Sequence, residues 1–276
     1  MAEDQNCTHD CSTCGSSCGS RTAPRDPHIP LGDSSHIKKV IAVMSGKGGV
    51  GKSSVTACLA AALRKSGKSV GVLDADITGP SIPKLFGIRE RAVATPMGIA
   101  PVETATGIRL MSLNLLTADE TDPVIWRGPV IAGVLQQFWS DVHWGDLDVL
   151  LIDMPPGTGD VAITVFQSLP VDGIVMVTSP QELASMIVTK AVKMAGEMKV
   201  PILGLIENFS YFRCPDCGKT HAIFGESHAG EIARQFGIPL LAQLPMDPSL
   251  AASGDRGEVE KADLSLFAPV LDALKL

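Results

Sequence analysis

Short apolar runs alternate with stretches of helical periodicity from Lys38 onward. The runs are rich in Val, Ile and Leu and are bounded by Gly, Pro and polar residues, as β-strands are. They predict strands at 40–44, 69–73, 148–152, 173–177, 202–206 and 240–244. The helical patterns between them predict helices at 53–66, 130–142, 162–168, 182–197 and 229–236.

This alternation predicts the fold class. Strands that are apolar along nearly their whole length need cover on both faces, which parallel sheets receive from crossover helices. We therefore expect an α/β domain with a doubly wound, mainly parallel sheet, in which ligands bind beyond the carboxyl ends of the strands. Residues 92–113, with Gly98 and Gly107 between short apolar stretches, predict an antiparallel excursion from that sheet.

The first 36 residues differ in composition from the rest of the chain. They are rich in Ser, Thr, Gly, Asp and Pro and offer almost nothing that could be buried. Such a composition is typical of a flexible segment. The sequence thus predicts a cysteine-bearing arm and linker at 1–36, followed by one domain at 37–276.

Composition and charge narrow the functional classes. Of the 276 residues 45% are hydrophobic and 19% charged, which is enough to fill a large core. A formal net charge of −7 disfavours nucleic-acid binding by phosphate neutralisation. Apolar stretches such as 149–152 are far shorter than a membrane helix, and the N-terminus lacks the apolar run of a signal peptide. We expect a soluble, cytoplasmic protein with no nucleic-acid or membrane partner.

A phosphate-binding pattern follows the first predicted strand. Gly46 to Ser53 reads G-K-G-G-V-G-K-S, which matches G-x-x-x-x-G-K-[ST] between a strand and a helix. The glycines let backbone N–H groups turn toward phosphate oxygens, and the helix N-terminus adds positive partial charge. Lys52 is expected to bridge the β- and γ-phosphates of ATP, and Ser53 to bind Mg²⁺. The predicted nucleotide contacts are Gly46, Gly48, Gly49, Val50, Gly51, Lys52, Ser53 and Ser54.

Three aspartates come at or after strand ends. Asp74 and Asp76 close the second predicted strand, and their i, i+2 spacing directs both to one face. Asp153 follows the apolar strand at 148–152, the arrangement that holds Mg²⁺ directly or through water. We assign Asp76 to orienting the attacking water, and Asp74 and Asp153 to the Mg²⁺ site.

Six of the seven cysteines are clustered, whereas Cys58 lies at helical spacing among apolar residues and is expected in the core. In a reducing compartment such clusters indicate metal binding or redox chemistry. Cys214-Pro-Asp-Cys217 supplies two thiols, too few for a tetrahedral zinc or a four-iron cluster, and a twofold-related partner chain could supply two more. A structural zinc clasp and a thioredoxin-like redox pair remain as alternatives. The arm's four cysteines could hold iron–sulfur or zinc, with His9 as a substitute ligand, or nothing: Cys7, Cys11, Cys14 and Cys18.

Lys47, after the first glycine of the phosphate loop, is not required for cradling phosphate. Here the sequence resembles the deviant-Walker P-loop ATPases, dimeric enzymes in which this lysine reaches the partner's nucleotide. The resemblance implies that Lys47 is catalytic, stabilising charge across the interface as an arginine finger does.

The motifs together resemble the Mrp/Nbp35-type iron–sulfur cluster carrier ATPases over residues 38–276. The resemblance rests on 46–53, 74–81, 153–160 and 207–212, the last leading into the C-x-x-C. It implies a homodimer that holds a [4Fe–4S] cluster between subunits at Cys214 and Cys217. The cluster would be delivered to apo iron–sulfur proteins in an ATP-dependent cycle. The arm cysteines look like those of one branch, although the gap after the first is shorter here.

The same resemblance suggests contacts to the nucleotide base from Asn208, Pro245 and Asp247.

The alternative function is that of a positioning ATPase of the ParA/MinD type, here with a structural zinc, because such proteins share the phosphate loop and Lys47. They need a basic surface or a basic amphipathic helix. The C-terminal stretch 266–276 has instead a broad, nearly uncharged apolar face and is expected to pack on the core. Reductases such as the nitrogenase iron protein have cluster cysteines well separated in sequence, unlike Cys214 and Cys217.

Overall fold

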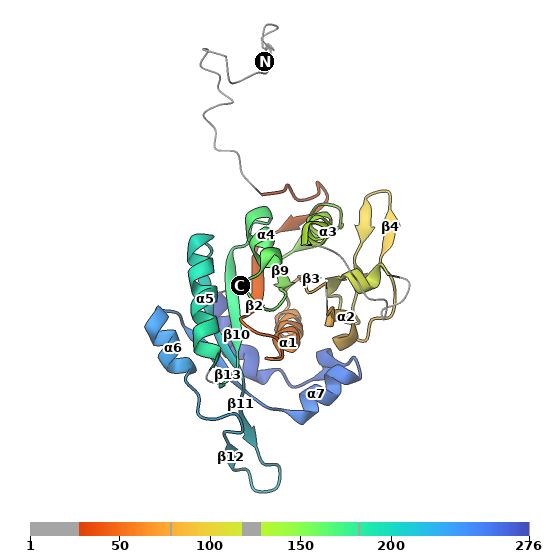
Figure 1. Cartoon of the computed structure of the whole chain (residues 1–276). Helices are drawn as coiled ribbons and strands as arrows, with labels where there is room; N and C mark the ends of the chain where they lie inside the picture. The colour runs from red at the N-terminus through yellow and green to blue at the C-terminus, as the bar shows by residue number, and fades with distance from the viewer. Residues whose placement is uncertain (1–27, 78, 118–127, 182, 276) are drawn as a thin grey trace, which may run out of the picture.

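A nine-stranded sheet forms the centre of the computed structural model, which describes residues 28–77, 79–117, 128–181 and 183–275. Within those residues the strand order is β12-β11-β10-β2-β9-β3-β7-β6, with β13 paired to β11 (Figure 1). The inner pairs are parallel, and the antiparallel pairs are β11 with β12 and β6 with β7. The strands of this sheet are β2 (Val40–Ser45), β3 (Val70–Asp74), β6 (Val102–Glu103), β7 (Arg109–Met111), β9 (Val149–Asp153), β10 (Gly173–Thr178), β11 (Ile202–Arg213), β12 (Thr220–His221) and β13 (Leu240–Pro245).

Two hydrophobic clusters lie on opposite faces of the sheet, because successive side chains of a strand alternate between its faces. In β2, Val40, Ala42 and Met44 belong to the first cluster, whereas Ile41 and Val43 belong to the second. The first cluster is covered by α3 (Gly128–Ser140), α4 (Asp160–Ser168), α5 (Leu183–Glu197) and α6 (Ala229–Phe236).

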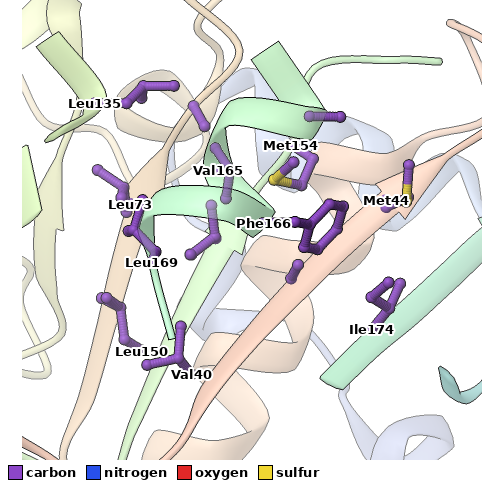
Figure 2. Close-up of a cluster of buried hydrophobic side chains, with 14 of the residues drawn as sticks. Val40, Met44, Leu73, Leu135, Leu150, Met154, Val165, Phe166, Leu169 and Ile174 are labelled. Carbon is purple, nitrogen blue, oxygen red and sulfur yellow. The ribbon is translucent and has the colours of Figure 1, made fainter. Parts of the chain in front are cut away.

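Figure 2 shows part of the first cluster, where Val165 and Phe166 of α4 lie among Val40, Met44 and Leu150 of the strands. The second cluster is covered by α1 (Lys52–Lys65), α2 (Ile82–Leu85) and α8 (Ala268–Leu274). α8 lies within the apolar C-terminal stretch, which packs on the core as expected. The predicted doubly wound, mainly parallel sheet is thereby confirmed.

The remaining elements are short. The antiparallel excursion predicted for residues 92–113 is present in part: β4 (Val93–Thr95) and β5 (Gly98–Ala100) make a separate antiparallel hairpin, whereas β6 and β7 join the main sheet, β7 parallel to β3. The others are β1 (His36–Ile37), β8 (Asp146–Leu147), α7 (Pro248–Asp255) and the 3₁₀ turns η2 (Leu113–Leu115), η3 (Val259–Lys261) and η4 (Ser265–Phe267). No helix among the described residues has both the length and the apolar character that a membrane span requires.

One strand differs from its prediction. Most predicted ends agree with the observed ends to within two residues, but β11 continues seven residues beyond the predicted end at Ile206. Polar residues at 207, 208 and 210 interrupt the apolar run and so mask the continuation. The extension pairs with β12, with Phe212 opposite His221, and the resulting hairpin projects from the sheet at the lower end of Figure 1. We call residues 211–224 the cysteine hairpin.

The segment before β2 lies along the domain rather than apart from it. The indole Nε1 of Trp139 donates to the Ile29 carbonyl over 2.9 Å, and the Ile29 N–H donates to the Ser168 carbonyl over 2.8 Å. Ile29 and Leu31 pack on the first cluster, and β1 pairs with β8. The composition predicts a linker through residue 36, whereas the structure docks the chain from Ile29 onward through these apolar contacts, hydrogen bonds and strand pairing. The arm cysteines and His9 lie outside the described residues.

Candidate functional site

The phosphate loop connects β2 to α1 at the centre of the sheet, and we call residues 46–53 the P-loop. Gly49 and Gly51 have φ angles of 80° and 76°, in the left-handed region that favours glycine. A Cβ at Gly51 would lie 2.3 Å from the side-chain nitrogen of Asn208, so any larger residue there would clash. The P-loop, Asp76 and Pro156 line a hollow of about 210 Å³. The strand–loop–helix context predicted for this motif is present.

Lys52, Ser53 and Asp153 meet at the floor of this hollow. The Lys52 ammonium lies 2.7 Å from Asp153 Oδ2, and the Ser53 hydroxyl donates to the same oxygen over 2.6 Å. Lys52 and Asp153 are buried, so the pair interacts in a poorly screened environment. A hydroxyl and a carboxylate facing each other are the oxygen ligands that Mg²⁺ prefers. Three residues assigned from the sequence are thus brought into direct contact.

Thr56 completes this group and was missed by the sequence analysis. Its hydroxyl lies 2.7 Å from Asp153 Oδ1 and 3.0 Å from the Lys52 carbonyl oxygen, and its side chain is buried. Thr56 therefore holds the carboxylate oxygen that Ser53 does not contact. The available signal was helical spacing, because residues 53 and 56 lie on one face of a helix.

Asp74 and Asp76 differ in environment. Asp76 Oδ2 lies 3.9 Å from the Lys52 ammonium and borders the hollow. Asp74 is fully buried, and its oxygens accept from the backbone N–H groups of Asp76 and Ile82 and from the hydroxyl of Ser112. Burial, followed by the nearby charge of Asp153, raises the pKa of Asp74 well above its ordinary value. Asp74 thus holds the turn after β3 in place, and its predicted role at Mg²⁺ stays a prediction.

Lys47 extends from the P-loop to the side chain of Gln181, whose amide oxygen accepts a hydrogen bond from its ammonium. Gln181 comes three residues after the end of β10, the neighbour of β2 in the sheet. Gln181 was not predicted from the sequence, although its place after a strand end was a usable signal. Within the described chain, the lysine assigned to a trans role therefore has a partner in cis.

The residues predicted near the base contact the protein backbone. Asn208 is buried, and its Nδ2 donates to the Val50 carbonyl over 2.9 Å, which ties β11 to the P-loop. Pro245 ends β13, and Asp247 caps α7 by accepting from the Ser249 N–H over 2.8 Å. Pro245 and Asp247 thus lie at and just beyond the carboxyl end of β13, whereas Asn208 lies within the neighbouring strand β11. Contacts to a base stay predictions.

Cys214 and Cys217 occupy the turn of the cysteine hairpin. Cys214 is half-buried and Cys217 exposed. The N–H groups of Cys217 and Asp216, followed by the thiol of Cys217, lower the pKa of Cys214 and favour its thiolate. The turn joins two strands and opens no helix, unlike a thioredoxin-type motif. Among the described residues no third His, Cys, Asp or Glu completes a metal site with them, so this part of the chain offers two thiols.

Comparison with known proteins gives these features a context. The model of one family, described as ParA: NUBPL iron-transfer P-loop NTPase, matches residues 36–272. An iron–sulfur cluster carrier protein of Methanocaldococcus jannaschii is 49% identical over 225 residues, 81% of this chain and 78% of that protein. A protein of the same description from Methanococcus maripaludis is 44% identical over 263 residues, 93% of this chain and 90% of its own length.

Solved structures agree on the fold. The nucleotide-binding protein of Archaeoglobus fulgidus, in complex with ADP, is 46% identical and superposes with a TM-score of 0.75. The alignment covers 84% of this chain and 92% of that one. The cell-division ATPase MinD of Pyrococcus furiosus superposes with a TM-score of 0.63 at 19% identity, covering 86% and 98% of the two chains. At that identity the likeness shows a shared P-loop NTPase fold alone.

Proposed function

The chain belongs to the NUBPL family of iron-transfer P-loop NTPases, and from this premise we propose that it is an ATP-dependent iron–sulfur cluster carrier. Two copies would hold one [4Fe–4S] cluster on their paired Cys214 and Cys217 thiolates. The cluster would then pass to apo iron–sulfur proteins. The cysteine hairpin carries this proposal, because it presents two accessible thiols, one with a lowered pKa, and no third ligand among the described residues.

Two thiolates per chain match half of a four-iron site. A [4Fe–4S] cluster takes four cysteine ligands, and a twofold axis brings the same patch of two subunits together. The hairpin projects away from the sheet, which leaves room for a second copy to approach its turn (Figure 1). Exposed cysteines at an interface are also accessible to a recipient protein, as transfer requires.

The second part of the proposal is hydrolysis of ATP at the P-loop. Lys52 would neutralise phosphate charge, and its present partner Asp153 would remain beside Ser53. The Ser53 hydroxyl and the Asp153 carboxylate fit Mg²⁺, and Asp74 is predicted to contribute to the surroundings of the ion. The ion would withdraw charge from the phosphates. Asp76, at the edge of the hollow, would orient the attacking water. Asn208, Pro245 and Asp247 would lie beside the base.

Lys47 would act across the dimer interface. Its ammonium is held by Gln181 on the same chain through one hydrogen bond at an exposed site. Such a contact is weak in water, so a phosphate on a partner chain could displace it. A positioning function of the MinD type is not favoured, since the likeness to those proteins is one of fold.

The decisive experiment is metal analysis of anaerobically purified and reconstituted protein. Iron, acid-labile sulfide and zinc are measured per dimer for the parent and for Cys214→Ser and Cys217→Ser. Cys58→Ala is the matched control, because this cysteine is buried in α1, away from the hairpin. We expect both serine variants to lose one cluster per dimer and the control to keep it. Unchanged iron in the serine variants would refute the site, and zinc without sulfide in the parent would support a structural clasp.

A further inference from the structure

Phe209 has a backbone conformation that L-residues rarely adopt. Its φ angle is 58°, in the left-handed region, although it lies inside β11 between Asn208 and Ser210. At the same place the pairing of β11 with β13 shifts register between Glu207 and Tyr211. A strained residue persists only where its surroundings hold it, and such residues gather at functional sites and switches.

The contacts of Phe209 explain what holds it. On one side, a Cβ built on Gly51 of the P-loop would lie 3.1 Å from Phe209 Cζ, so the ring lies against the loop backbone. On the other side, the ring contacts Phe224, with centroids 6.4 Å apart and planes tilted by 58°. That geometry is within the favourable range for aromatic pairs. Phe224 lies on the returning arm of the cysteine hairpin, so one side chain contacts both sites of the proposed function.

The neighbouring residue strengthens the link. Asn208 is buried and donates to the Val50 carbonyl, so the backbone just before Phe209 is fixed to the P-loop. From Phe209 the strand continues without interruption to Arg213, and Cys214 follows directly. Figure 1 shows this strand running from the sheet to the hairpin. Five residues of one strand and one ring contact thus connect the loop at residues 50–51 to the cysteines.

We propose that Phe209 is a positioning residue that couples nucleotide binding at the P-loop to metal binding at Cys214 and Cys217. This rests on the proposed function, because it requires both sites to be occupied in the carrier's cycle. A phosphate that draws the backbone at Gly51 inward shifts the Phe209 ring, and the ring shifts the hairpin through Phe224. Because coupling between two binding sites is reciprocal, a cluster on the cysteines changes nucleotide affinity by the same factor.

The test measures that factor directly. The dissociation constant of a fluorescent, non-hydrolysable ATP analogue is determined with Mg²⁺ for metal-free and for cluster-reconstituted full-length protein. The ratio of the two constants is the coupling, and values of about 5-fold or more are typical of linked sites. Phe209→Leu keeps an apolar side chain but removes the ring. Phe236→Leu makes the same ring-to-aliphatic change in α6, where Phe236 packs on the first hydrophobic cluster outside both sites, and is the matched control.

We expect the parent and Phe236→Leu to share one ratio, and Phe209→Leu to bring it within about 2-fold of unity. Phe224→Leu removes the ring on the hairpin side and should have the same effect, which keeps the test decisive if Phe209→Leu does not fold. A parental ratio in folded, cluster-loaded Phe209→Leu and Phe224→Leu would overturn the inference, as would a ratio of one in the parent. Loss of a merely structural contact would change the melting temperature and leave the ratio unaltered. A parent that binds no cluster at these cysteines would instead refute the proposed function.

Discussion

Thr56→Val is the most direct test of how the nucleotide site is built. Valine has nearly the shape of threonine, so the substitution removes one hydroxyl from a fully buried position without opening a cavity. Among the described residues, Thr56 is the donor that the structure gives to Asp153 Oδ1, over 2.7 Å. The variant leaves that oxygen without its donor, while Lys52 and Ser53 still hold Oδ2.

The expected magnitude follows from the charge of the acceptor. A hydrogen bond to a buried charged group contributes about 1.5–3 kcal/mol, and the unpaired carboxylate oxygen carries the full desolvation cost. For a domain of this size 1 kcal/mol shifts the melting temperature by about 2–4 °C, so Thr56→Val should lower it by about 3–12 °C. Thr56→Ser keeps the hydroxyl and loses one methyl group, which costs about 1 kcal/mol and about 2–4 °C.

Two measurements separate the hydroxyl from the methyl group. Thermal unfolding reports stability, and titration with Mg²⁺ and a non-hydrolysable ATP analogue reports whether Asp153 still supports the metal. We expect Thr56→Val to weaken both and Thr56→Ser to lower stability alone. If Thr56→Val melts within about 1 °C of the parent and binds nucleotide equally well, the hydroxyl does not hold Asp153 as argued. Equal losses of stability in the two variants, with binding intact, would make Thr56 a packing residue.

Four further predictions concern Asp76, the cysteines and the docked segment. Asp76→Asn should retain nucleotide binding and lose most ATP turnover, measured as phosphate release, because its predicted role is to orient water; turnover at the parental rate would refute that role. Cys214, whose pKa is lowered, should be alkylated at a lower pH than an ordinary cysteine. Burial raises the pKa of Cys58 to about 12 and should protect this thiol from alkylation until the protein unfolds. Peptide mapping after alkylation at a series of pH values checks this order. Removing residues 1–27 should leave the melting temperature unchanged and lower iron per dimer if the arm holds a cluster, with equal iron indicating zinc or an empty arm. Removing 1–37 should also destabilise the domain, because the contacts of Ile29 and the β1–β8 pairing are lost.

Features that depend on residues close together in the chain could be predicted from the sequence alone. The P-loop was recognisable because its glycines, Lys52 and Ser53 act within eight positions, and left-handed backbone at Gly49 and Gly51 needs glycine. Six strands of the central sheet were recognisable because each contains a nearly continuous apolar run: β2, β3, β9, β10, β11 and β13. The strand-end position of Asp153 followed from the same pattern, and these signals predicted fold class and nucleotide site together.

Contacts between distant segments could be seen only in the folded chain. Strand order brings Asp153 beside Lys52, and Gln181 within reach of Lys47, although more than a hundred residues of chain separate the members of each pair. It also lets β11 continue past its polar interruption, since Asn208 finds a partner in the P-loop that a local pattern cannot reveal. The left-handed backbone of Phe209 likewise depends on contacts between distant segments. A strained residue has no sequence signature, because the contacts that hold it come from Gly51 and Phe224 and exist only after the sheet has formed.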